Sequence, residues 1–252
     1  MRLINTKTFL LESIYTPVPY DILSHTWGPE EISFQEWEVV HDSGAIQGQC
    51  PHTQKMPRPN VTRKRGYDKV MGACQQAARD GIQYLWCGTN CIDKTSSAEL
   101  SEAINSMFAW YRDSKVCYVI LTDVQVPTNT SLHGHKSNTE GCFTTIHRKA
   151  LQDSSTIFSF SIAQRMSWAA DRRTTVPKDM AYCLLGIFDI NMPMLYGQGQ
   201  KAFLKLQEEI IKISDDESIL AWNRTDLSLD PTSGLAWSPA AFKACGDICR
   251  YE

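Results

Sequence analysis

Two cysteines stand four positions apart in the segment LWCGTNCIDK, which covers residues 85–94. Cys87 and Cys91 could bind a metal together, or Cys91 could act as a nucleophile if His25 or a helix N-terminus lowered the pKa of its thiol. Structural zinc sites usually carry a C-x-x-C pair with matched cysteine or histidine partners, and this C-x-x-x-C pair lacks such a pattern. The segment therefore predicts no metal site, and Cys91 stays a candidate nucleophile.

Residues with useful chemistry follow each of three predicted strands. An imidazole, indoles, carboxylates and small polar groups are the mixture expected of a small-molecule site. His25, Asp93 and Cys91 are candidates for proton transfer or nucleophilic attack. The candidate ligand-binding residues are Ser24, Thr26, Trp27, Gly28, Trp86, Gly88, Thr89, Asn90 and Asp123. A structural role is the alternative for each one alone, since His25 and Trp27 could close the core at the sheet edge and Asp93 could cap a turn.

The elements that must position these residues alternate between strands and helices. Short apolar runs predict strands at residues 9–14, 21–24, 82–87 and 115–121. An apolar stripe between Gly66 and Gly81 predicts one helix, and Ser96 with Glu99 forms a capping box that starts another. This order is typical of a doubly wound parallel sheet, so we expect an α/β fold for residues 1–125. The carboxyl ends of the strands should meet at one edge and form a crevice.

The remaining segments are less regular. Residues 42–66 predict an exposed insertion loop, and residues 126–160 predict an irregular insertion. Residues 161–252 are expected to be mainly helical, with a late strand at 218–222. A chain of 252 residues with this order of elements favours a single domain.

The composition bears on partners and compartment. Hydrophobic residues make up 42% and charged residues 21% of the chain, as in folded globular proteins. A net charge of −3 and a pI near 6.1 do not suit a nucleic-acid-binding surface. Nine cysteines without regular spacing favour reduced thiols, and neither a secretory leader nor a run of 18 apolar residues is present. We therefore expect a cytoplasmic protein, with the nucleus as the alternative, and no nucleic-acid or membrane partner.

Four segments together resemble a known family. They read YDILSHTWG at residues 20–28, YLWCGTNCIDK at 84–94, ELSEAINSMFAWYRDSKVCYVIL at 99–121 and AQRMSWAADRRTTVPKDMAYCLLGIFDINMPMLYGQGQKAFLKLQEEII at 163–211. In these segments the chain is similar to the fungal heterokaryon-incompatibility (HET) domain. The resemblance implies an intracellular module of non-self recognition and programmed cell death. It also implies a flavodoxin-like sheet similar to that of TIR domains, whose enzymatic members cleave NAD.

Two departures from the family pattern bear on the crevice. Where the family usually reads WIDTCCIDK, this chain has Gly88 in place of the acidic residue and Asn90 in place of a cysteine. The tryptophan-rich segment of the type RGWTLQEL is also missing, and the polar stretch TNTSLHGHKSNTEG stands at residues 128–141 instead. A carboxylate at the crevice is therefore lost. We also expect a stand-alone module, because the chain starts and stops close to the family motifs.

Three functions compete at this stage, and whether the chain is an enzyme stays open. The first is a HET module of cell death with TIR-like cleavage of NAD as its candidate substrate, for which Glu99 or Glu102 would supply the carboxylate. The second is a repurposed enzyme of secondary metabolism that acts on a small organic ligand in the altered crevice. Gly88 in place of an acidic residue would make room for this ligand, and Asn90, His25, Asp93 and Cys91 could orient or protonate it. The third is a catalytically inactive interaction module that forms homo-oligomers. No cofactor is certain under any of them.

Overall fold

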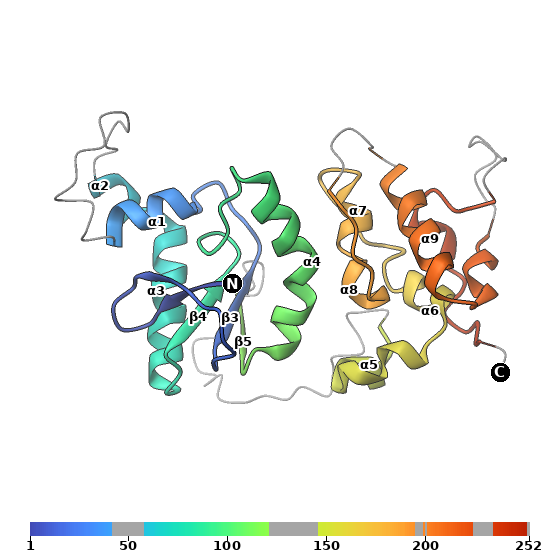
Figure 1. Cartoon of the computed structure of the whole chain (residues 1–252), viewed down its shortest axis with the longest axis horizontal. Coiled ribbons are helices and arrows are strands. Elements are labelled where there is room, and N and C mark those ends of the chain that lie inside the picture. The colour runs from blue at the N-terminus through green and yellow to red at the C-terminus, as the bar shows by residue number, and fades with distance from the viewer. Residues whose placement is uncertain (42–57, 121–145, 195–198, 200, 224–233, 251–252) are drawn as a thin grey trace, which may run out of the picture. The chain divides into compact units, whose positions relative to one another are not determined.

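A computed structural model describes residues 1–41, 58–120, 146–194, 199, 201–223 and 234–250. The chain divides into two compact units, one formed by residues 1–103 and 110–130 and the other by residues 104–109 and 131–252. The first unit contains the sheet, and Figure 1 shows its strands between two long helices, α3 (Arg65–Arg79) and α4 (Ser97–Asp113). The candidate residues that the sequence places after the strands therefore belong to this unit.

The sheet has five strands in the order β2-β1-β4-β3-β5. Their bounds are β1 Arg2–Asn5, β2 Leu11–Ser13, β3 Asp21–His25, β4 Tyr84–Cys87 and β5 Cys117–Ile120. Strand β3 pairs in parallel with β4 on one side and with β5 on the other. This 2-1-3 order of successive parallel strands is that of a flavodoxin-like sheet, and the predicted α/β fold is confirmed. Strand β1 was not predicted, and it pairs antiparallel with both β2 and β4, so the sheet is mixed.

The two faces of the parallel strands carry different cores. Neighbouring residues of a strand point to opposite faces, so Trp86 and Cys87 lie on opposite sides of the sheet. Cys87 faces helix α3, and burial together with the nearby Cys87 raises the pKa of the Cys74 thiol on that helix. Trp86 packs on the other side, with ring centroids 5.4 Å from Trp110 and 5.9 Å from Tyr111 of helix α4. The helices α3 and α4 thus cover opposite faces, as a doubly wound sheet requires.

Helix α3 ends where the sequence predicts. The amide of Gly81 donates to the carbonyl of Ala78 at 3.2 Å, and the amide of Ile82 donates to that of Ala77 at 2.9 Å. These two bonds form a Schellman motif, in which the residue after the C-cap adopts a left-handed conformation. Gly81 has a φ of 79°, so glycine is required here for its backbone freedom.

A substitution tests this requirement at Gly81. Gly81→Ala should lower the free energy of unfolding by about 1–2 kcal/mol, because a Cβ in the left-handed region meets its own backbone. No other atom lies within 4 Å of the added Cβ, so packing does not contribute. Urea denaturation would measure the loss, and an unchanged midpoint at an unchanged slope would contradict the assignment.

Two further helices of the first unit were not predicted. Helix α1 covers Phe34–His41 and buries Phe34 and Trp37, and the short helix α2 covers Arg58–Val61. The predicted exposed loop at residues 42–66 is therefore wrong in its last part, which holds α2 and the start of α3. Residues 42–57 of that prediction lie outside the described residues.

The second unit is mainly helical, as predicted for residues 161–252. The irregular insertion predicted for residues 126–160 is wrong in its last part, because residues 148–159 form helical turns. Its elements are α5 Arg148–Gln152, η3 Ser154–Ser159, α6 Ile162–Ser167, α7 Asp179–Tyr182, α8 Leu185–Phe188, α9 Lys201–Ile213, η4 Glu217–Leu220 and η5 Pro239–Phe242. The strand predicted at residues 218–222 is wrong, because residues 218–220 belong to the 3-10 helix η4. Ile219 is buried in the core of this unit, and this burial, not strand pairing, explains its apolar character. Within the described ranges, no helix is both long and apolar enough to cross a membrane.

Candidate functional site

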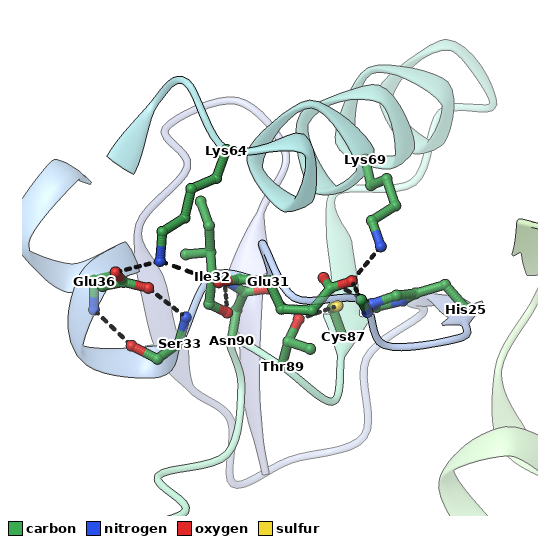
Figure 2. Close-up of polar contacts among 11 residues, drawn as sticks. His25, Glu31, Ile32, Ser33, Glu36, Lys64, Lys69, Cys87, Thr89 and Asn90 are labelled. Atoms are coloured by element: carbon green, nitrogen blue, oxygen red, sulfur yellow. Dashed lines mark hydrogen bonds and ion pairs between the residues drawn. The ribbon is translucent and has the colours of Figure 1, made fainter. Parts of the chain in front are cut away.

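The carboxyl ends of the three parallel strands meet at one edge of the sheet. Leu23 pairs with Cys87, the last residue of β4, and His25 pairs with Ile120, the last residue of β5. The loops that leave these strands therefore start side by side, which is where ligands bind in open α/β sheets. Figure 2 shows the polar contacts that follow β3 and β4 at this edge.

His25 forms the centre of a partly buried ionic cluster. Its side chain is 2% exposed, and its Nε2 lies 3.2 Å from Oε2 of Glu31. The other carboxylate oxygen of Glu31 accepts a hydrogen bond from the amide of Gly28 at 2.9 Å and forms an ion pair with Lys69 of helix α3 (Figure 2). Glu31 and Lys69 are 14% and 18% exposed. We call His25, Glu31 and Lys69 the edge triad.

Burial and the contacts within the edge triad shift the pKa values of His25 and Glu31. Burial lowers the pKa of His25, so the imidazole is neutral at pH 7. With Glu31 accepting from Nε2–H, the lone pair resides on Nδ1, which is buried and has no hydrogen-bond partner among the described residues. Burial alone would raise the pKa of Glu31, but Lys69, the Gly28 amide and His25 together lower it. The cluster thus combines a neutral base with an ionised carboxylate.

An exposed aromatic residue lies between His25 and Glu31 in the chain. Trp27 is 60% exposed, and the ammonium of Lys94 lies 3.4 Å from the centroid of its ring. The charges of Glu31 and Lys94 act on each other, which places Lys94 near the edge triad. Burial of its ammonium lowers the pKa of Lys94, although the residue as a whole is exposed. The indole face and the cation together suit a planar ring with an anionic substituent.

Two predicted ligand-binding residues after β4 lie in the core instead. Thr89 is 2% exposed and Asn90 is fully buried. The hydroxyl of Thr89 donates to Oδ1 of Asn90 at 2.8 Å, and Nδ2 of Asn90 donates to the carbonyl of Ile32 at 3.3 Å (Figure 2). These bonds tie the loop after β4 to the segment that carries Glu31. We therefore assign both residues a role in positioning the edge triad.

Cys91 does not have the surroundings of a nucleophile. It is 3% exposed, and burial raises the pKa of its thiol far above the usual range. The sulfur accepts a hydrogen bond from the amide of Cys87 at 3.4 Å, and the imidazole of His25 is engaged with Glu31. Cys91 therefore acts as a small core residue. All cysteines of the described part are free, and no group of three metal-ligating side chains is found there.

Asp93 and Glu99 hold the loop that leads into helix α4. Oδ1 of Asp93 accepts from the hydroxyl and the amide of Thr95 at 2.6 and 2.9 Å, and these bonds lower its pKa. Glu99 accepts from the amide of Asp93 at 2.7 Å and forms an ion pair with Arg2. The predicted capping box is half formed. The hydroxyl of Ser96 accepts a hydrogen bond from the amide of Glu99 at 3.3 Å, but the carboxylate of Glu99 accepts from the amide of Asp93 and not from that of Ser96. Turn stabilisation, the alternative weighed for Asp93, thus accounts for both carboxylates.

The position that lost its acidic residue is not open. A Cβ added to Gly88 would lie 3.2 Å from the indole of Trp86, so this ring occupies the space beside the glycine. Trp86 is 1% exposed and packs in the core, so it offers no surface for stacking a ligand. Its Nε1 is buried without a partner among the described residues. The expectation that Gly88 makes room for a substrate is not supported by this geometry.

The remaining predicted residues fall into three groups. Ser24 hydrogen-bonds to the side chain of Tyr111 and faces helix α4. Thr26 and Gly28 are exposed, and of these two only the amide of Gly28 reaches the edge triad. Asp123 lies outside the described residues. The edge thus brings together His25, Trp27 and Gly28 of the predicted set.

Sequence reasoning missed the charged partners of His25. Glu31 is the last residue of the turn signal GPEE, and Lys69 lies on helix α3 beside the buried Val70. Neither position is marked by a motif, because their approach to His25 depends on the path of the chain between β3 and α1. The pair of acidic residues just after a predicted site loop was the only available signal for Glu31.

The lowered pKa of His25 has a consequence for stability. The unfolded chain takes up a proton on this residue below pH 6.5, the ordinary value, while the folded chain resists protonation. The free energy of unfolding should therefore fall as the pH drops below 6.5. His25→Gln should reduce this slope but not remove it, because burial also lowers the pKa of His41. Urea denaturation at several pH values would measure both slopes, and equal slopes would contradict the assignment.

Comparison with known proteins identifies the family. A family model described as heterokaryon incompatibility protein (HET) matches residues 20–177. The vegetative incompatibility protein HET-E-1 of Podospora anserina is 36% identical over 248 residues, an alignment that covers 81% of this chain and 17% of that relative. This chain therefore spans less than a fifth of that relative's length. No solved structure matches significantly. Since the family model covers more than half of the sequence, the chain belongs to the heterokaryon incompatibility family.

Proposed function

We propose that this chain is a cell-death module of fungal non-self recognition that cleaves the N-glycosidic bond of NAD at the carboxyl edge of its sheet. The observation that carries the proposal is the edge triad, in which a neutral imidazole contacts an ionised carboxylate at 3.2 Å. The similarity to a vegetative incompatibility protein supports the part in incompatibility, which comes to this chain as a proposal because the alignment covers 17% of that relative.

Glu31 would stabilise the positive charge of the reaction. When the bond between nicotinamide and ribose breaks, its electron pair leaves with nicotinamide and the ribose becomes an oxocarbenium ion. Lys69 and the Gly28 amide keep Glu31 ionised, so its negative charge is present before the bond breaks. Glu99 and Glu102 are the carboxylates that the sequence suggested for this role; Glu99 is bound by Arg2 and the Asp93 amide at the start of α4, and Glu102 is exposed.

His25 would complete the hydrolysis. A water molecule attacks C1′ of the oxocarbenium ion and must lose one proton to give ADP-ribose. Nδ1 of His25 carries the lone pair and has no partner in the described part of the chain, but it is buried, so substrate binding would have to expose the ring before Nδ1 accepts this proton. Glu31 would then stabilise the imidazolium through Nε2–H. The protein returns to its starting state when His25 releases the proton to solvent.

Trp27 and Lys94 would bind the substrate. The exposed face of Trp27 suits a nicotinamide or adenine ring, and the ammonium of Lys94 suits the pyrophosphate. Because Lys94 lies over the same indole, a stacking ring would displace it toward the phosphates. Both residues are within the loops that follow β3 and β4, as the crevice rule requires.

The experiment is incubation of the purified protein with NAD. Chromatography should show nicotinamide and ADP-ribose in equal amounts, increasing with protein concentration and time. Absence of nicotinamide after long incubation at high protein concentration would refute the catalytic part of the proposal. The module would then act as an interaction module, which light scattering over a concentration series would reveal as homo-oligomer formation.

The repurposed enzyme of secondary metabolism receives less support. Its motive was additional space at Gly88, and Trp86 occupies that space. Asn90, which was expected to help orient its substrate, is buried and bonded within the protein.

A further inference from the structure

Lys94 covers the aromatic ring on which the proposed substrate would stack. Its ammonium lies 3.4 Å from the centroid of the Trp27 indole. Trp27 follows β3 and Lys94 follows β4, and both residues are exposed, so a ligand can reach them from solvent. A planar ring that stacks at this position would take the place of the ammonium. Binding therefore depends on what the ligand offers to the displaced ammonium.

The ammonium of Lys94 lacks an anionic partner. Among the residues that the structure describes, it donates no hydrogen bond and forms no ion pair, and it lies over the indole instead. Burial lowers the pKa of Lys94, and the charge of Glu31 opposes this effect without direct contact. Glu31 cannot serve as the partner, because its carboxylate is engaged by His25, Lys69 and the Gly28 amide. A phosphate group of a ligand would supply the missing acceptor.

The carboxylate next to Lys94 in the chain is also engaged elsewhere. Oδ1 of Asp93 accepts hydrogen bonds from Nε2 of Gln35 at 2.7 Å and from the hydroxyl of Thr95 at 2.6 Å. These contacts tie Asp93 to helix α1 and to the turn before α4, while the side chain of Lys94 reaches the loop after β3. The cation over Trp27 is therefore available to an incoming anion.

Neutral rings and rings with a phosphate should differ at this face. A neutral ring that stacks on Trp27 removes the cation–π contact of Lys94 and gives the ammonium no new partner. A ring with an attached phosphate also displaces the ammonium but binds it through the phosphate. We propose that Lys94 is a specificity-determining residue, which restricts the indole face of Trp27 to planar rings that carry a phosphate. The location of the site rests on the proposed function, and its ligand class is nucleotides and not nucleosides or free bases.

Titration with a nucleotide and its nucleoside would test this selectivity. The probes are AMP and adenosine, which share their ring and ribose and lack the nicotinamide bond of the proposed cleavage. Ligand-observed NMR suits the weak binding expected of a single stacked ring. AMP should bind the whole chain at least about tenfold more tightly than adenosine, since one charge-assisted hydrogen bond is worth such a factor. Absence of AMP binding at millimolar concentration, or equal binding of adenosine, would overturn the proposal.

Lys94→Ala distinguishes a residue that covers the ring from one that only attracts phosphate. The variant loses the partner of the phosphate and uncovers the indole, so AMP should bind about tenfold more weakly and adenosine about threefold more tightly. Lys115→Ala is the matched control, because Lys115 is exposed, lies just before β5 at the opposite ends of the parallel strands, and changes the net charge equally. It should leave both affinities unchanged. Adenosine binding that does not increase in Lys94→Ala, or AMP binding that does not fall, would overturn the role of Lys94.

Trp27→Ala locates the binding on the indole. It should abolish binding of both probes, and circular dichroism checks its fold, which should persist because Trp27 is exposed. AMP binding retained in the folded variant would overturn the site. The outcome is separate from that of the NAD incubation. If NAD is cleaved without this selectivity, the role of Lys94 fails alone, and if the selectivity is found without cleavage, the proposed reaction fails alone.

Discussion

Alanine in place of Gly66 should lower the free energy of unfolding by about 2 kcal/mol and displace Glu31 from His25. Gly66 is in the first turn of helix α3, and its amide donates to the carbonyl of Glu30 at 3.0 Å. An added Cβ would lie 2.7 Å from that carbonyl oxygen and 2.8 Å from Cα of Glu31. These are backbone atoms, so the helix or the segment that carries Glu31 must move.

The shift of helix α3 should also weaken the contacts that hold Glu31. Lys64 and Lys69, on either side of Gly66, hold the carbonyl and the carboxylate of Glu31, so a shift of α3 disturbs both contacts. Gly72→Ala is the matched control, because it lies on the same helix and a Cβ there meets no atom within 4 Å. It should stabilise the helix by about 0.5–1 kcal/mol. Urea denaturation of both variants would decide, and similar midpoints would contradict the close contact at Gly66.

The fold could be predicted where long segments repeat a pattern. The apolar stripe of α3 marks a helix with its buried side, and Gly81 marks its end. Strand β1 has only four residues, RLIN, which is too short for a period of two to stand out. Its antiparallel pairing with β4 depends on contacts between segments far apart in the sequence, which no local pattern predicts. The apolar run at residues 218–222 suggested a strand for the same reason, since a short buried run does not distinguish a strand from a helical turn.

The site could be predicted only in its location. The rule for parallel sheets places His25 and the loop after Cys87 at one edge, and the pairing of β3 with β4 and β5 agrees with it. The partners of His25 come from elsewhere: Glu31 returns to it through the loop before α1, and Lys69 reaches it from α3. Polar character also misled at Thr89 and Asn90, because a buried turn needs side-chain hydrogen bonds as much as a binding site does.

Replacing Glu31 with glutamine should reduce NAD cleavage at least about 100-fold, if Glu31 stabilises the oxocarbenium ion as proposed. Glutamine keeps the size of the side chain and can still accept a hydrogen bond from Gly28 or His25. It removes the negative charge that the reaction needs and leaves Lys69 without its ion-pair partner. The rate of nicotinamide release at saturating NAD would measure the effect on the chemical step.

Comparing Glu99→Gln with Glu31→Gln shows which of these two carboxylates takes part in the reaction. Its loss weakens the contacts with Arg2 and the Asp93 amide, so stability should fall while the rate changes by no more than a few-fold. Glu217→Gln controls for the change of net charge, because Glu217 is exposed and lies in η4 of the second unit. If Glu99→Gln abolished cleavage and Glu31→Gln did not, the reaction would belong to the start of α4. If all three variants kept the activity of the unchanged protein, neither Glu31 nor Glu99 would be the group that stabilises the oxocarbenium ion.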